Sequence, residues 1–175
     1  EYKLVQDKAA NAWCMPGGKI VVYTGILPIT KNEAGLATVM GHEVAHALAN
    51  HGQQRMSANV LQQLGAAGVG VATSGKSAET QQLAMAAYGG GSNVIGVLPF
   101  SRKHETEADD IGLVLMAIAG YNPSDALAFW QRMAKQGGSS QPEFLSTHPS
   151  NSTRIENLNK RIPEAKREAA KYSKK

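Results

Sequence analysis

The sequence lacks several features that would point to common classes of protein. Its 175 residues include one cysteine, Cys14, which excludes an internal disulfide framework and a metal site made of cysteines alone. No apolar run approaches the roughly 20 residues that a membrane-spanning helix needs. Aromatic residues make up only 6% and charged residues 18% of the chain, whereas 42% of it is hydrophobic. This length and composition favour a globular chain of about one domain over a disordered or fibrous one.

Most of the chain also lacks an excess of one charge, although the net charge is +4 and the sequence pI is near 9.2. Residues 160–175 hold seven basic and two acidic side chains, whereas the first 159 residues hold 11 basic and 12 acidic ones. Because the body is nearly neutral, we expect no nucleic-acid partner. We expect one domain over residues 1–162, followed by a basic, solvated C-terminal tail over residues 163–175.

The chain begins with Glu1 rather than with Met. We interpret it as a processed or truncated chain, from which a signal peptide, lipid anchor or membrane segment could have been removed. On this interpretation the protein could bind a membrane peripherally through that missing segment. The sequence makes no prediction of the oligomeric state.

Residue periodicity predicts a mostly helical α+β fold with one small sheet near the N-terminus. The run 19–24 is rich in β-branched residues and follows a Pro-Gly-Gly turn signal. A capping box at Thr30 and Glu33 predicts a helix that ends with a C-cap at Gly52. For residues 73–98 we expect a mobile loop or weakly packed helices. Helical spacing predicts further helices over residues 56–71, 103–119, 122–137 and 153–162, with Pro163 breaking or restarting the last one.

The strongest chemical signal is the motif H-E-V-A-H that starts at His42. Residues four apart share one face of a helix, so the imidazoles of His42 and His46 can hold one metal ion. Zinc accepts imidazole nitrogen and keeps an open position when three protein ligands bind it. Glu43 can take a proton from the attacking water and pass it to the leaving amine. The alternative is a surface helix that carries these residues by chance, and the apolar neighbours such as Val44 disfavour it.

A site of this type needs a third protein ligand. His51 is one residue short of the position that the extended metzincin motif uses, so we expect it at a helix C-terminus instead. The later run E-T-E-A-D offers Glu105 and Asp109, which are four apart and share a helix face. One carboxylate could complete the site while the other holds the second ring nitrogen of a ligand imidazole. Spacing alone leaves open an ordinary acidic start of a helix.

Four ordered motifs resemble those of the M48 family of zinc metallopeptidases, over about residues 10–160. They are N-A-W-C-M-P-G-G at 11–18, H-E-V-A-H at 42–46, the run 101–109 with its E-x-x-x-D, and T-H-P at 147–149 followed by Arg154. The resemblance implies a zincin-like fold and an endopeptidase with one Zn²⁺ per chain. It implies Glu105 as the third zinc ligand beside His42 and His46. It further implies Asp109 as the partner of a ligand imidazole and Glu43 as the catalytic base.

The resemblance also implies how a polypeptide substrate would bind and react. An extended substrate would pair with an edge strand near Lys19–Thr24 that borders the active site. His148, oriented by Arg154, is the candidate that stabilises the oxyanion. Alternatively, His148 on a mobile loop could occupy the open zinc position and silence the enzyme. Cys14 is expected to be structural rather than catalytic.

Within the family, soluble periplasmic members, often lipid-anchored, fit best, because residues 56–100 are too polar and glycine-rich for membrane helices. We therefore expect a periplasmic or outer-membrane-associated endopeptidase that acts on unfolded or misassembled envelope proteins. The alternative is a degenerate or auto-inhibited member that serves as a binding or chaperone-like module. The complete set of His42, Glu43, His46 and Glu105 argues against a degenerate member.

Overall fold

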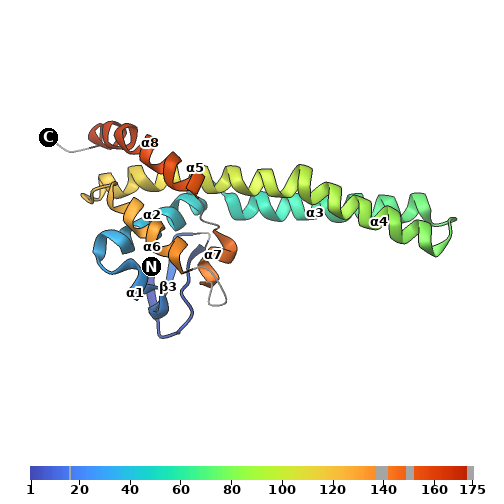
Figure 1. The fold of residues 1–175 in the computed structure, drawn as a ribbon, viewed down its shortest axis with the longest axis horizontal. Coiled ribbons are helices and arrows are strands. Elements are labelled where there is room, and N and C mark those ends of the chain that lie inside the picture. Colours follow the sequence, from blue (N-terminus) through green and yellow to red (C-terminus); the bar gives the residue numbers. More distant parts are fainter. Residues whose placement is uncertain (16, 137–141, 149–151, 173–175) are drawn as a thin grey trace. The chain divides into compact units, whose positions relative to one another are not determined.

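The computed structural model describes residues 1–15, 17–136, 142–148 and 152–172. It divides into two units, one of residues 1–49 with 105–175 and one of residues 50–104 (Figure 1). Helices dominate the described residues, and the few strands lie near the N-terminus. The predicted class, mostly helical α+β with a small N-terminal sheet, is confirmed.

The first unit contains the sheet and most of the helices. In chain order its elements are β1 (Tyr2–Val5), β2 (Ala12–Met15), β3 (Lys19–Tyr23), the 3₁₀ turn η1 (Thr24–Ile26), α1 (Leu27–Thr30), α2 (Glu33–Leu48), most of α5 (Leu98–Ile118), α6 (Asp125–Lys135), α7 (Glu143–Thr147) and α8 (Ser152–Ala170). The second unit contains α3 (His51–Thr73), α4 (Ala78–Ser92), the π-helical segment η2 (Asn93–Val97) and the start of α5.

The sheet has the strand order β1-β3-β2, so β3 is its central strand. β1 pairs with β3 in parallel, from Tyr2 opposite Ile20, and β2 pairs with β3 antiparallel, from Ala12 opposite Val22. The prediction that Lys19–Thr24 forms the edge strand was therefore wrong. β3 already has a hydrogen-bonded neighbour on each side, because the exposed segment β1 adds a third strand. The two edges of the sheet belong to β1 and β2.

The core of the first unit is shared by the sheet and the helices around α2. Figure 1 shows the N-terminal strands (blue) and α6 and α7 (orange) close to α2. Among the described residues, the largest fully buried side chains are Trp130, Phe129, Phe144, Ile26, Leu113, Met116, Met133, His42 and Val39. A histidine among these apolar side chains is unusual, because burying a polar group requires a partner for it.

Both predicted ends of α2 needed correction. The N-cap is Asn32, whose side-chain oxygen accepts a hydrogen bond of 2.9 Å from the Gly35 amide. Thr30 instead ends α1, where its hydroxyl donates to the carbonyl of Leu27. α2 ends at Leu48 rather than near Gly52, because the next residues turn with a positive φ of 56° at Asn50 and α3 begins at once.

α2 and α5 approach at two glycines, and this contact positions the chemistry-bearing faces of both helices. A Cβ added at Gly112 would lie 3.1 Å from the backbone nitrogen of His42, and one at Gly41 would lie 3.0 Å from the carbonyl oxygen of Gly112. At these two glycines the backbone of α2 therefore packs directly against the backbone of α5. Gly112 lies one and two turns beyond Asp109 and Glu105 on α5, so the approach brings their helix face towards His42.

We expect Gly112→Val to destabilise the first unit and to lower its zinc content. The branched side chain would press on the backbone of α2, and overpacking of this kind costs about 1–3 kcal/mol. Thermal unfolding followed by circular dichroism, with elemental analysis for zinc, measures both effects. Gly68→Val is the matched control, because a Cβ at Gly68 meets nothing within 4 Å. Equal unfolding midpoints for the two variants would contradict the proposed role of this helix crossing.

α8 corrects the prediction for the C-terminal segment. We expected Pro163 to break or restart the helix and the following residues to be solvated, but α8 runs through Pro163 to Ala170. Ala165 and Ala169 are buried, in helical register with Leu158 and Ile162. Packing of this apolar face outweighs the loss of one backbone hydrogen bond at the proline. The domain boundary at residue 162 itself stays a prediction.

The second unit is a hairpin of α3 and α4, where a mobile loop or weakly packed helices were expected over residues 73–98. The outcome is helical, and no residue of α4 is buried. The Tyr88 hydroxyl of α4 donates a 2.9 Å hydrogen bond to the carbonyl of Gln62 on α3, and Gln62 in turn donates to the Ser92 hydroxyl at 2.9 Å. Among the described residues, none of the helices combines the length and the hydropathy that crossing a bilayer requires.

Candidate metal centre and active site

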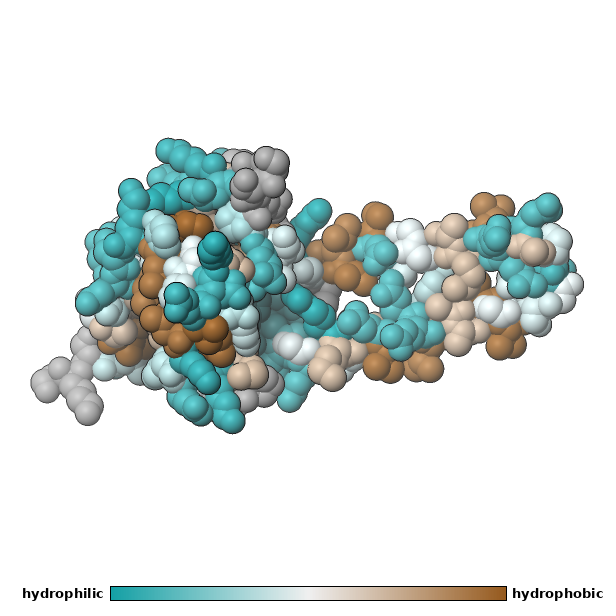
Figure 2. Space-filling view, turned by 90° about the horizontal axis from the view of Figure 1, so that it is seen from below, coloured by the Kyte–Doolittle hydropathy of each residue, from teal (hydrophilic) through white to brown (hydrophobic). Residues whose placement is uncertain are grey.

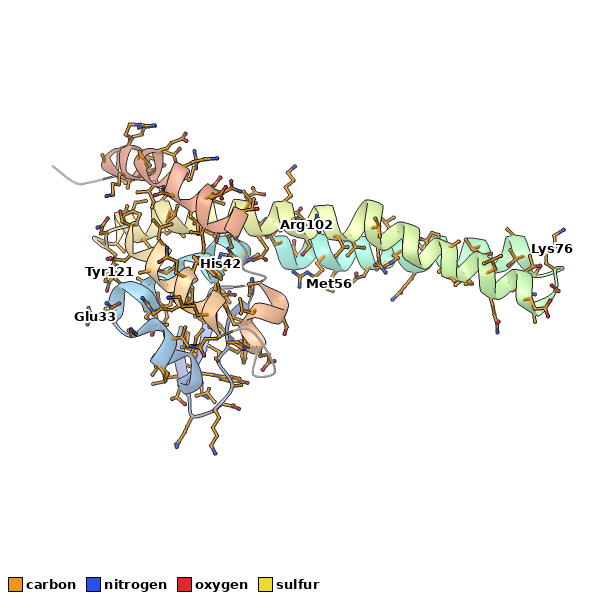
Figure 3. All side chains as sticks on the ribbon, in the orientation of Figure 1. Glu33, His42, Met56, Lys76, Arg102 and Tyr121 are labelled. Atoms are coloured by element: carbon orange, nitrogen blue, oxygen red, sulfur yellow. The ribbon has the colours of Figure 1, made fainter. Side chains whose placement is uncertain are left out.

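Four side chains from different parts of the first unit bring their ligand atoms within 4.8 Å of one another. His42 and His46 come from α2, Glu105 comes from α5, and His148 follows the last residue of α7. Figure 3 labels His42 on α2, inside this unit. The sequence-predicted ligands His42, His46 and Glu105 therefore lie together, and His148 joins them.

The spacing of these atoms fits a zinc ion. His42 Nε2 lies 3.0 Å from His46 Nε2 and 3.3 Å from Glu105 Oε2, while His46 Nε2 lies 3.3 Å from Glu105 Oε1. Four ligands about 2.0–2.1 Å from a tetrahedral zinc ion are about 3.3 Å apart. Two imidazoles and a carboxylate are also a donor set that zinc accepts in catalytic sites. The residues present thus match the size and the chemistry of the predicted site.

A second layer of contacts orients the His42 ring. His42 Nδ1 lies 3.0 Å from Asp109 Oδ1, and this contact turns Nε2 towards the ligand cluster. Asp109 is held in turn by Arg154 of α8, whose Nε and Nη2 donate to its two carboxylate oxygens at 2.7 and 2.6 Å. Such paired bonds fix both the position and the plane of the carboxylate. The structure therefore places Asp109 next to the imidazole of His42, one of the predicted ligands.

Arg154 has a partner that the sequence did not predict. Its guanidinium carbon lies 3.4 Å from the centre of the Trp130 ring, a cation–π contact at a buried site. The Trp130 ring also packs against the His42 ring in an edge-to-face arrangement, with ring centroids 5.5 Å apart. The helical periodicity of α6 indicates that Trp130 is buried. It does not predict the contact of Trp130 with Arg154. Arg154 also lies 3.4 Å from the carbonyl oxygen of His148, the residue that it was predicted to orient.

The charges of the cluster shift the pKa values of its members strongly. Burial lowers the pKa of His42, but hydrogen bonds to Asp109 and Glu105 outweigh this and raise it to about 9. Burial raises the pKa of Glu105, yet contacts with three imidazoles, His148 first, bring it far below the usual range. Asp109 follows the same pattern, since the charge of Arg154 overcomes the burial that would raise its pKa. Without metal, His42 thus holds a proton at neutral pH, whereas Glu105 and Asp109 stay ionised.

This proton on His42 predicts that zinc binding depends on pH. Because the metal needs the lone pair on Nε2, it displaces a proton below pH 9, and apparent zinc affinity should rise about tenfold per pH unit towards that value. Calorimetric titration at neutral pH in two buffers of different ionisation enthalpy counts the released protons, and we expect about one from His42. Asp109→Asn should reduce the release, because it removes a contact that holds the proton. A titration that releases no protons would contradict the assigned state of His42.

Glu43 lies beside the ligands with its carboxylate buried. The residue is 4% exposed, and its Oε1 has no hydrogen-bond partner among the described residues. His148 Nε2 lies 3.3 Å from this oxygen but without hydrogen-bond geometry. Burial raises the pKa of Glu43 to about 7, although the Cys14 backbone amide opposes the shift. A buried carboxylate of this kind is poised to exchange a proton near neutral pH.

His148 reaches into the centre of the cluster. Its Nδ1 lies 3.0 Å from Glu105 Oε2 and 3.1 Å from His42 Nε2, distances like those between the other three ligands. Burial lowers the pKa of His148 to about 4, so the ring is neutral at neutral pH. A neutral imidazole can donate a lone pair to a metal. The geometry therefore offers His148 as a fourth ligand.

Two residues weighed from the sequence lie outside the ligand group of the described residues. His51 begins α3 rather than ending α2, so its predicted place at a helix C-terminus was wrong. It is buried and stacks on His104, with ring centroids 4.0 Å apart and ring planes 14° from parallel. Cys14 is a free, half-buried thiol on β2, and burial raises its pKa, which makes it a poor nucleophile.

Comparison with known proteins gives the same family. The family model described as Peptidase family M48 matches residues 1–162. The chain is 40% identical over 171 residues to the mitochondrial metalloendopeptidase OMA1 of Schizosaccharomyces pombe, covering 94% of this chain and 47% of that protein. Identity to OMA1 of Saccharomyces cerevisiae is 37% over 181 residues, covering 94% and 48%. The beta-barrel assembly-enhancing protease of Escherichia coli is 30% identical over 159 residues, covering 87% and 32%.

The chain spans about half the length, or less, of these curated relatives. Within that span lie the H-E-x-x-H helix, the E-x-x-x-D helix and the cluster of His42, His46 and Glu105 that they form. Its metal is zinc, as the ligand geometry indicates and as the family requires. The chain therefore belongs to peptidase family M48, a family of zinc metallopeptidases.

Proposed function

We propose that this chain is the catalytic part of an endopeptidase that hydrolyses peptide bonds in extended, unfolded polypeptides. The observation that carries the proposal is the buried Glu43 carboxylate, whose Oε1 has no hydrogen-bond partner among the described residues, next to the ligand set of His42, His46 and Glu105. In this proposal those three residues hold the zinc ion. Asp109 and Arg154 keep His42 in the orientation that the metal needs.

Glu43 carries the proton transfers of the proposed reaction. A bound zinc ion supplies a Lewis acid that polarises the scissile carbonyl and acidifies a water molecule. The ionised Glu43 accepts the proton of that water at Oε1 and then delivers it to the nitrogen of the leaving amine. Its pKa of about 7 lets the same carboxylate gain and lose a proton within one turnover. The buried surroundings keep competing water away from the carboxylate.

The substrate, in our proposal, pairs with β2 rather than with the central strand β3. The Tyr23 amide donates to the carbonyl of Asn11 at 3.0 Å. Antiparallel alternation then turns the backbone groups of Ala12 and Cys14 to the free edge of the sheet. The Cys14 amide already bonds Glu43 from that edge. An extended polypeptide added there would lie beside the catalytic carboxylate, whereas a folded protein offers no free backbone to pair.

Envelope proteins that are unfolded or misassembled are the proposed physiological substrates. One bacterial relative is named for enhancing β-barrel assembly, whereas the OMA1 relatives are named as mitochondrial. Because relatives of both kinds match, the periplasmic or outer-membrane-associated location and the lipid anchor stay predictions from the resemblance. Substrate recognition through backbone pairing would serve in either compartment.

A cleavage assay with matched folded and unfolded substrate tests the proposal. The zinc-loaded chain should cleave reduced, carboxymethylated α-lactalbumin and leave the native, disulfide-bonded protein intact. Chelation of the zinc should stop cleavage, and one equivalent of zinc should restore it. A zinc-loaded chain that binds the unfolded protein without cleaving it would contradict the proposal and support the binding module.

We further propose that His148 silences the site in the arrangement seen here. With His148 as a fourth ligand, no position remains for the water, and closed four-ligand zinc sites are structural rather than catalytic. Removing the plug raises the fraction of active molecules. If His148 fills the position nine-tenths of the time, His148→Ala should raise the cleavage rate about tenfold while zinc content stays the same. Steady-state cleavage of the unfolded substrate measures this directly.

The competing role of His148 predicts the opposite sign. As an oxyanion donor, its loss would lower kcat by about 10²–10³. His148→Gln separates the two roles further, because its amide can still donate a hydrogen bond but ligates zinc poorly. Activity that falls in His148→Ala and recovers in His148→Gln would overturn the plug and establish the donor.

A further inference from the structure

The second unit carries an uncharged surface that catalysis does not explain. We call α3, α4 and η2, residues 51–97, the hairpin. No charged residue occurs over residues 56–75 or 80–101, although the chain as a whole is 18% charged and about eight would be expected over these 42 positions. The few charges near the hairpin lie at its ends. Figure 3 shows Lys76 at the turn between α3 and α4, with Met56 and Arg102 near the opposite end.

A stripe of apolar side chains points from α3 into solvent. Met56, Val60, Leu64 and Val71 are 70%, 54%, 64% and 76% exposed. Their spacing places them on one side of the helix. Gln62 and Gly65 lie on another side of α3, against Tyr88 of α4. The stripe is thus not the face that holds the hairpin together, and the two helices leave it uncovered.

Apolar surface is present elsewhere on the hairpin too. Leu83 of α4 and Val94 of η2 are 73% and 65% exposed. Figure 2 shows apolar residues (brown) in several groups along the hairpin, on the right of the view. A groove of about 680 Å³ between the helices is lined by Leu61, Tyr88 and small residues, together with the polar side chains of Gln62 and Ser92. Exposed apolar patches of this extent mark interaction sites.

The distribution of charge favours a lipid surface over a protein partner as what covers the hairpin. A single protein partner covers one face, and the remaining faces would carry the charges of an ordinary surface. Here charged side chains are missing from every side of α3 and α4 over residues 56–75 and 80–92. A helix without charge on any side suits surroundings of low polarity, in which a charged side chain would be costly. The many Gln, Ser, Asn and Gly residues make the helices too polar to cross a bilayer, in keeping with the absence of a span among the described helices. Helices of this intermediate polarity suit the boundary between the headgroups and the acyl chains of a bilayer.

We propose that the hairpin inserts its apolar stripe into the surface layer of a phospholipid bilayer. Met56, Val60, Leu64 and Val71 enter the acyl region, while the uncharged polar side chains remain among the headgroups. Lys76, at the turn between the two helices, reaches the phosphate level. Insertion rather than charge supplies the affinity, so the hairpin binds bilayers of neutral net charge. This inference does not rest on the proposed catalysis, because no hairpin residue belongs to the candidate site.

Flotation of the full 175-residue chain with small vesicles of dioleoylphosphatidylcholine tests the proposal. The chain should float with the vesicles, and about 0.5 M sodium chloride, which screens exposed charges, should leave binding in place. Val60→Ser with Leu64→Ser should weaken partitioning about tenfold or more, because both side chains lose their burial in the acyl region. Asn59→Ser with Gln63→Ser, two neighbouring exposed polar positions, is the matched control and should change partitioning less than about twofold. Circular dichroism and zinc content verify that both double variants are folded.

Three results would overturn the proposal. The first is a folded chain that does not float with the vesicles, or a Val60/Leu64 variant that floats like the unchanged chain. The second is binding that high salt abolishes, which would assign it to cations instead. The third is concentration-dependent dimerisation in sedimentation equilibrium that the Val60/Leu64 variant loses, without flotation, which would assign the stripe to a second copy of the chain.

Discussion

Glu43→Gln should abolish peptide hydrolysis while leaving zinc in place. The amide has nearly the shape of the carboxylate but cannot accept the proton of the attacking water, and general base catalysis of this kind contributes about 10²–10⁴-fold. Because Glu43 is not among the ligand atoms of the cluster, zinc content should remain at one per chain. We expect kcat on the unfolded substrate to fall about a thousandfold, with KM little changed.

Two observations would contradict this assignment of Glu43. One is a Glu43→Gln variant that retains more than about a tenth of the activity, which would place the base elsewhere. The other is loss of zinc from the variant, which would make Glu43 part of the metal site. Glu107→Gln is a matched control, because Glu107 is exposed and lies outside the ligand group. It should leave kcat unchanged.

Glu105→Ala should empty the metal centre. Glu105 lies within 3.3 Å of both His42 and His46, and without it only imidazoles, those of His42, His46 and His148, remain to hold the ion. Losing a partner of a ligand costs about 10- to 100-fold in metal affinity, and losing the ligand itself should cost more. Competition with a chromogenic zinc chelator measures the affinity, and hydrolysis should fall with zinc occupancy.

The control for this prediction is again on α5. Glu107→Ala removes a carboxylate two residues away, at an exposed position, and should leave zinc affinity within about twofold. Asp109→Asn should lie between the two variants, with a loss of about 10- to 100-fold. If Glu105→Ala binds zinc as tightly as Glu107→Ala does, the third ligand is another group, and His148 is the first candidate.

The sequence predicted the centre of the site because helix geometry is local. Four-residue spacing alone puts His42 beside His46 and Glu105 beside Asp109, whatever the rest of the fold does. What joined the two helices was the resemblance to a family, since no local rule says that α2 and α5 cross. The physical cause of that crossing, close contact at Gly41 and Gly112, can be read only from the structure.

The sheet and α8 show where local reasoning fails. The run that starts at Lys19 has the composition of a strand. Whether it is a central or an edge strand depends on β1, which is exposed and shows little hydrophobic alternation. Likewise, Pro163 signals a helix end locally, and the burial of Ala165 against the core overrides it. Both outcomes depend on contacts between residues far apart in the chain, which propensity does not contain.

The network around Arg154 was only partly foreseen. T-H-P and Arg154 were linked to each other by the resemblance, and the structure adds the ion pair with Asp109 and the cation–π contact with Trp130. No spacing rule connects α5, α6 and α8, because side-chain networks of this kind form only after the helices have packed. The contacts of Arg154 with Asp109 and Trp130 can therefore be read only from the structure.

Anomalous diffraction at the zinc absorption edge, from crystals of the zinc-loaded chain, would locate the metal itself. We expect one zinc ion per chain, about 2.0–2.2 Å from His42 Nε2, His46 Nε2 and a Glu105 carboxylate oxygen, with Glu43 close by but not bonded to it. A zinc ion bound elsewhere, or bound to Glu43 instead of Glu105, would contradict this expectation.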